Sequence, residues 1–202
     1  MDKNIINYEF LEDIIEVKDK EDKIYILKNF LTPNGLLGIK EMLKKNEDIE
    51  ENWESVSTIN NFNTRKRLKI VFDNTIYQLQ KEINSEKFYG FLKDNFKIDI
   101  EDINFTIWKD LSGFEIGMHI DDIKYIDASI QIYITDITYH NLGTSFGYEN
   151  GSTFLTLPYR DNFGYFSKTS NRMKHGLINR VPEKLNRFSL YINIKEKKLK
   201  DE

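Results

Sequence analysis

The sequence predicts a mainly β protein in which helices of the N-terminal half support a C-terminal β-sandwich or barrel. After about residue 100, short segments rich in β-branched and aromatic residues recur between Gly, Asn and Asp, a spacing typical of sandwiches and barrels. Before that point, apolar residues recur at helical spacing. A length of 202 residues fits one domain, 1–202, with helix-rich support over 1–100 and a β core carrying the functional site over 101–195.

Local signals predict the elements of the first half. Residues 23–28 indicate an early strand, and Thr32 followed by Pro33 predicts a helix with Thr32 as its N-cap. Residues 46–63 are polar and rich in Asn, which predicts a loop, and residues 68–72 alternate as a strand does. Two further helices are predicted by apolar stripes: Ile76, Leu79 and Ile83, and, after Ser85 as N-cap, Phe88, Leu92 and Phe96.

The second half is expected to hold strands at 104–108, 115–121, 128–134, 153–157, 164–166, 175–180 and 187–194. Alternation in 115–121 places His119 and Asp121 on one face, and Ile116, Met118 and Ile120 on the other. In the last strand Arg187, Ser189, Tyr191 and Asn193 share one face. These polar faces meet either solvent or a pocket. The helices carry apolar stripes that need a sheet to cover, which favours the pocket.

Composition excludes several classes of site. The chain has no cysteine, which rules out disulfides, iron–sulfur clusters and thiolate zinc sites. A net charge of −4 gives no general attraction to nucleic acid or an anionic membrane. The first residues lack the apolar run of a signal peptide, and no segment is apolar enough to span a membrane. We therefore expect a cytoplasmic protein with no membrane partner.

His119-Ile120-Asp121, with His175 further along the chain, supplies two imidazoles and one carboxylate. This is the ligand set of a non-haem iron(II) site that leaves other coordination positions open. Asp122 adjoins Asp121, and a local bulge could exchange the two. His140, the third histidine, is interpreted as a turn or surface residue.

Arg187 and Ser189 lie two residues apart, so in a strand both side chains point the same way. A guanidinium and a hydroxyl together suit an anionic carboxylate. A carboxylate co-substrate beside the proposed metal site is therefore expected.

Five short motifs follow one another in order: Trp108-x4-Gly113-x5-His119-x-Asp121, the strand from Ser129 to Tyr133, Gly143-Thr144, His175-Gly176 and Arg187-x-Ser189. Together they resemble the iron(II)- and 2-oxoglutarate-dependent oxygenases, and within these the prolyl-4-hydroxylase-like group. The resemblance covers residues 100–194, about half of the chain.

The resemblance implies a double-stranded β-helix, or jelly roll. It implies that His119, Asp121 and His175 bind iron and are the catalytic residues, and that Arg187, with Ser189 and Tyr133, binds the distal carboxylate of 2-oxoglutarate. O₂ would be the second co-substrate, with ascorbate as a reductant. The implied reaction hydroxylates an unactivated C–H bond and converts 2-oxoglutarate to succinate.

The substrate expected from the resemblance is a peptidyl residue such as proline, in a peptide or protein. The same chemistry on a free amino acid or small metabolite is the alternative, and a non-catalytic jelly-roll binding module is the rival from another class. The aromatic-rich segment 146–172 is expected to contribute one or two substrate contacts. Arg65-Lys66-Arg67 is the compact basic cluster and is interpreted as a solvated strand edge. A nucleic-acid substrate is not expected, and the oligomeric state is left open.

Overall fold

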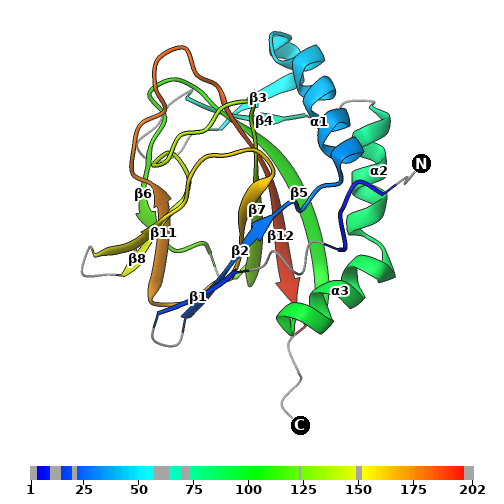
Figure 1. Ribbon diagram of the computed structural model, residues 1–202, viewed down its shortest axis with the longest axis vertical. Helices are drawn as coiled ribbons and strands as arrows, with labels where there is room; N and C mark the ends of the chain where they lie inside the picture. Colours follow the sequence, from blue (N-terminus) through cyan, green and yellow to red (C-terminus); the bar gives the residue numbers. More distant parts are fainter. Residues whose placement is uncertain are drawn as a thin grey trace.

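The computed structural model describes residues 4–9, 15–19, 22–56, 64–69, 73–122, 124–148 and 152–197. Within these ranges the strands form two antiparallel sheets, one of eight strands and one of four (Figure 1). In spatial order the large sheet contains β1 (Ile15–Asp19), β2 (Asp22–Lys28), β10 (Phe163–Lys168), β7 (Ala128–Ile134), β12 (Arg187–Glu196), β5 (Ile100–Asp110), β4 (Arg65–Leu68) and β3 (Trp53–Ser55). The small sheet contains β6 (Ile116–His119), β11 (Met173–Leu177), β8 (Ser145–Tyr148) and β9 (Thr153–Thr156).

The helices lie on the face of the large sheet away from the small sheet, as Figure 1 shows. They are α1 (Pro33–Asn46), α2 (Asn74–Ile83) and α3 (Glu86–Phe96), and a short 3-10 helix, η2 (Glu50–Asn52), follows α1. Thr32 and Ser85 cap α1 and α3 through side-chain oxygens that accept backbone N–H bonds, as predicted. No helix in these ranges combines the length and apolar character needed to cross a membrane.

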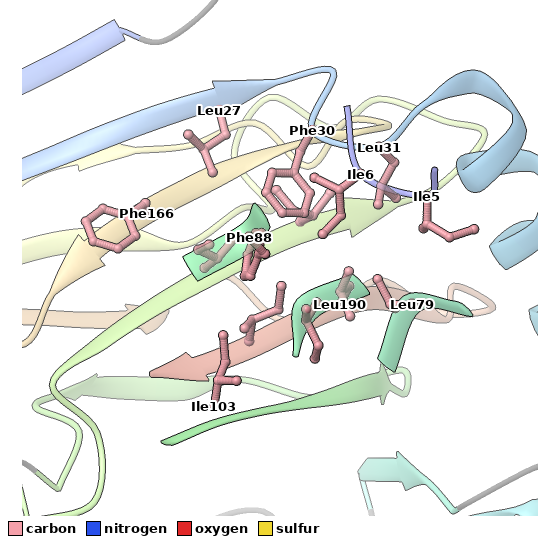
Figure 2. Close-up of a cluster of buried hydrophobic side chains, with 14 of the residues drawn as sticks. Ile5, Ile6, Leu27, Phe30, Leu31, Leu79, Phe88, Ile103, Phe166 and Leu190 are labelled. Atoms are coloured by element: carbon pink, nitrogen blue, oxygen red, sulfur yellow. The ribbon is translucent and has the colours of Figure 1, made fainter. Parts of the chain in front are cut away.

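The large sheet separates two hydrophobic clusters. On the helix side, Leu79 of α2 and Phe88 of α3 pack with Leu190 of β12 in one buried cluster, which Figure 2 shows in close-up. On the other side, Tyr133, Phe146 and Tyr165 belong to a second cluster, between the two sheets. The apolar face of the last strand is thus covered by helices, as the sequence predicted, and its polar face points toward the small sheet.

This arrangement is a jelly roll with supporting helices, and most predicted elements are present. Several expectations are corrected. The loop predicted at 46–63 contains η2 and β3, because Trp53 is buried against the core. Strands β1 and β8 were not predicted, the strand expected over 115–121 ends at His119, and the strand expected over 175–180 runs instead over Met173–Leu177. The strand predicted over 68–72 shares only Leu68 with the observed strand β4, which begins at Arg65, and residues 70–72 lie outside the described part of the chain.

Candidate metal centre

His119, Asp121 and His175 converge on one point between the sheets. Their ligand atoms all lie within 4.8 Å of one another. Asp121 carboxylate oxygens lie 3.8 Å from His119 Nε2 and 3.6 Å from His175 Nε2. Two atoms that each bind one ion at about 2.1 Å can be at most about 4.2 Å apart, so both pairs already fit a shared ion. The donor set therefore suits a divalent metal with open coordination positions.

A β-bulge in β6 determines which face of the small sheet the side chains around His119 occupy. His119 is the register partner of His175, but the next pair joins Ile116 to Leu177, so β6 has one residue more than β11. Paired residues share a face, so Ile116 and His119 lie on the same side of the small sheet. The alternation that placed Ile116 opposite His119 is therefore wrong. Gly176 faces the bulge, where a Cβ would meet Ile116 O at 2.6 Å.

Outer partners orient two of the proposed ligands. The ring Nδ1 of His119 lies 2.9 Å from Gly117 O. A carbonyl can only accept, so Nδ1 carries the proton and Nε2 is free for a metal. Tyr191 OH donates to Asp121 Oδ2 at 3.1 Å. Asp122 is exposed and its carboxylate accepts from the Lys124 amide, so the side chain that faces the histidines is Asp121.

Burial lowers the pKa of the His175 imidazole to about 4, an effect that Asp121 opposes and His119 reinforces. The ring is thus unprotonated at neutral pH, which is the form that binds metals. His140, in contrast, is exposed in a turn, as the sequence predicted.

A cavity of about 180 Å³ connects the three proposed ligands with Arg187. It is small beside the 300–1,000 Å³ or so of pockets for drug-sized ligands, so it suits a compact molecule. Its wall includes Arg65, Trp108, Asp110, Phe114, Ile116, Ile126, Gln131, Thr144, Tyr165, Gly176, Leu177, Tyr191 and Asn193.

The Arg187 side chain is buried and held from several sides. Its Nη1 donates to Asp110 Oδ2 at 2.6 Å and its Nε to Leu142 O at 3.0 Å. The guanidinium carbon lies 5.0 Å from the ring centre of Tyr133 and 5.4 Å from that of Tyr159. Burial alone would lower the pKa of the guanidinium, but Asp110 and the two tyrosines outweigh burial and raise it. Arg187 is therefore a fixed cation at the cavity wall.

Ser189 and Tyr133, also predicted to contact the co-substrate, are not among the residues that line the cavity. They lie behind its wall in one hydrogen-bonded chain. Gln131 Nε2 donates to Ser189 Oγ at 3.0 Å, Thr144 Oγ1 donates to Gln131 Oε1 at 2.6 Å, and Tyr133 OH donates to Thr144 Oγ1 at 3.0 Å. Gln131 and Thr144 are the members of this chain that line the cavity.

Sequence reasoning missed several residues of the cavity. Gln131 and Tyr191 could have been found, because each lies two residues from a predicted site residue on the same strand face. Arg65 and Asp110 could not, because only the pairing of distant strands brings them to Arg187.

Solved structures with the same fold include several oxygenases. A prolyl hydroxylase from Trichoplax adhaerens, in complex with a hypoxia-inducible-factor oxygen degradation domain peptide, matches with a TM-score of 0.66 and 10% identity, over 86% of this chain and 83% of that one. A Pseudomonas putida prolyl-4-hydroxylase matches with a TM-score of 0.65 and 10% identity, over 87% and 93%. The α-ketoglutarate-dependent epimerase SnoN of nogalamycin biosynthesis matches with a TM-score of 0.59 and 9% identity, over 87% of this chain and 78% of that one. At these identities the likeness shows the fold, and it confirms the predicted jelly roll.

Sequence comparison is less informative. No family model matches the chain. Peroxisome biogenesis factor 3 from Dictyostelium discoideum is 26% identical over 137 residues, which is 66% of this chain and 32% of that protein. The chain thus spans about a third of the length of this curated relative.

Proposed function

We propose that this chain, which shares the fold of the 2-oxoglutarate-dependent oxygenases, is an iron(II)- and 2-oxoglutarate-dependent hydroxylase of an unactivated C–H bond, most specifically of a peptidyl residue such as proline. One observation carries the proposal: His119, Asp121 and His175 converge at a cavity whose wall also holds the buried cation Arg187. A metal ligand set and a carboxylate-binding group in one small cavity match what a chelating 2-oxo acid needs.

Bound iron(II), with 2-oxoglutarate and O₂, supplies the oxidising power for C–H hydroxylation, and the co-substrate leaves as succinate and CO₂. His119, Asp121 and His175 would hold the metal. Arg187 binds the distal carboxylate, while Ser189 and Tyr133 support its binding through Gln131 and Thr144.

The difference in exposure among the ligands indicates where the substrate approaches. The His119 side chain is 37% exposed, whereas those of Asp121 and His175 are 15% and 16% exposed. A small co-substrate bound in the cavity would leave the His119 side as the open approach to the metal. A residue presented on a peptide fits this approach, and the Trichoplax neighbour is itself described with a peptide bound.

The same chemistry on a free amino acid or small metabolite is the second candidate. The structural neighbour SnoN favours this candidate, because SnoN is described as an epimerase of nogalamycin biosynthesis and not as an enzyme of peptides. The two candidates share the metal and co-substrate but differ in what enters from the His119 side.

The test follows succinate formation by the purified protein with iron(II), 2-oxoglutarate and O₂, with and without ascorbate. Mass spectrometry of a host lysate, incubated with the wild type or with Asp121→Ala, identifies molecules that gain one oxygen. A gain on peptides supports the first candidate, and a gain on small molecules supports the second. Absence of both turnover and 2-oxoglutarate binding favours a binding module without catalysis.

A further inference from the structure

Three charged residues form a row across neighbouring strands at the cavity wall. Arg187 of β12 and Arg65 of β4 are both register partners of Asp110, on the strand β5 between them. Arg187 Nη1 lies 2.6 Å from Asp110 Oδ2, and Arg65 Nε lies 3.0 Å from Asp110 Oδ1. The side chains of Arg187, Asp110 and Arg65 are 2%, 0% and 15% exposed. One buried carboxylate is therefore shared by two guanidinium groups.

The charges of this row set the attraction that the part of the wall around Arg187, apart from the proposed metal site, exerts on an anion. Arg187 and Asp110 alone cancel, so the pair would offer no net charge to an incoming carboxylate. Arg65 restores one positive charge. Arg65 and Arg187 are the only cationic side chains among the described residues that line the cavity. A carboxylate bound here would make the row neutral, which is favourable in a buried site where an uncompensated charge is costly.

Arg65 is held in place by the cavity wall itself. Its guanidinium carbon lies 4.2 Å from the ring centre of Trp108 and 5.0 Å from that of Phe114, and both rings line the cavity. The next two basic residues of β4 are engaged elsewhere, because Lys66 pairs with Glu50 and Arg67 with Glu54. The basic cluster Arg65-Lys66-Arg67 was interpreted from the sequence as a solvated strand edge, but the Arg65 side chain lines the cavity.

We propose that Arg65 supplies the net positive charge that binds the distal carboxylate of the co-substrate, and that Asp110 is a positioning residue that holds Arg65 and Arg187 together. Arg187 then orients the carboxylate and donates hydrogen bonds to it, whereas the net attraction of this row for an anion depends on Arg65. This inference rests on the proposed function, since it takes the anion to be 2-oxoglutarate.

The test is calorimetric titration of 2-oxoglutarate into protein loaded with Mn(II), which replaces iron(II) without oxidation. Arg65→Gln weakens 2-oxoglutarate binding by roughly tenfold or more, the loss that one charge-assisted interaction implies. Adding Asp110→Asn to Arg65→Gln returns the row to one positive charge, so the double variant regains most of the lost affinity. Arg65→Lys keeps the charge and binds more tightly than Arg65→Gln.

Arg67→Gln is the matched control, because it makes the same change of charge on the same strand at a half-exposed side chain outside the cavity. It leaves 2-oxoglutarate affinity unchanged. Mn(II) affinity, titrated separately, and thermal unfolding establish for each variant that the metal site and the fold are retained.

The outcomes separate the inference from the proposed function. Wild-type affinity in Arg65→Gln overturns the inference and leaves the proposed function intact. A folded double variant as weak as Arg65→Gln, or a folded Arg65→Lys as weak as Arg65→Gln, overturns the charge-balance account. A wild-type protein that binds Mn(II) but no 2-oxoglutarate refutes the proposed function, and the inference falls with it.

Discussion

His119 and His175 are register partners on strands β6 and β11, and the centres of their rings lie 4.6 Å apart. Backbone pairing therefore fixes the two-histidine part of the site before any metal is bound. Asp121 lies two residues beyond the end of β6 and is held instead by the hydroxyl of Tyr191. The Asp121 carboxylate is thus the proposed ligand whose position depends on a side-chain contact.

Asp121→Ala is expected to lower the affinity of the protein for iron(II) by more than about 100-fold, because loss of an outer partner alone typically costs 10–100-fold. Asp122→Ala is the matched control. Its carboxylate is exposed and bonds the Lys124 amide, so its loss leaves affinity unchanged. Anaerobic titration with iron(II) measures both. Retained binding in Asp121→Ala with lost binding in Asp122→Ala would reverse the ligand assignment.

Metal binding is expected to stabilise the folded chain, because the three donors converge only in the native state. At a free Mn(II) concentration 100 times the dissociation constant, the gain is about 2.7 kcal/mol, or roughly 5–10 °C in melting temperature for a domain of this size. Thermal unfolding with Mn(II) and with a chelator measures the shift. His175→Ala, which removes one donor, should show none; an equal shift in this variant would place the metal elsewhere.

Tyr191→Phe is expected to weaken iron(II) binding by about 10–100-fold while the protein stays folded, because it removes only the hydroxyl that orients Asp121. Tyr125→Phe is the control, since this ring is 62% exposed. Anaerobic titration and thermal unfolding are compared for the two variants. Equal metal affinity in both would show that Asp121 needs no support from Tyr191.

Phe88→Ala is expected to destabilise the protein by about 3–5 kcal/mol. The ring is fully buried between α3 and the large sheet, where it packs against Phe30 and Phe91. Chemical denaturation measures the change, with Asp94→Ala, whose side chain is exposed, as the control on the same helix. A loss below 1 kcal/mol would mean that α3 contributes little to the fold.

The sequence predicted the elements whose signals are local. Strand β7 was predicted to the residue, and the helix starts after Thr32 and Ser85 were predicted because a cap and an apolar stripe lie within a few residues of each other. The three proposed metal ligands were brought together as the motifs implied. Each of these inferences needed only a short segment of chain, or a spacing typical of a family.

What the sequence could not predict depends on pairing between distant strands. Strand β8 has four residues and is stabilised by β11 and β9, so its own sequence carries little signal. The row formed by Arg65, Asp110 and Arg187 requires the register of three strands. The bulge in β6 is likewise visible only against its partner, and it moved Ile116 to the face of His119.

Gly176→Ala tests whether this bulge is needed for the metal site. A Cβ at position 176 would lie 2.6 Å from Ile116 O and 2.8 Å from Gly117 O, so the backbone of β6 must move away from β11. We expect a loss of about 1–3 kcal/mol in the free energy of unfolding, as for other overpacked sites. Weaker iron(II) binding should accompany this loss, because the displaced strand carries His119.

Gly90→Ala is the control: a Cβ there has no neighbour within 4 Å, and Ala in a helix is favoured over Gly by up to about 1 kcal/mol. If denaturation and iron(II) titration gave Gly176→Ala the stability and affinity of the wild type, the two strands could separate without cost, and the bulge would not be what holds His119 opposite His175.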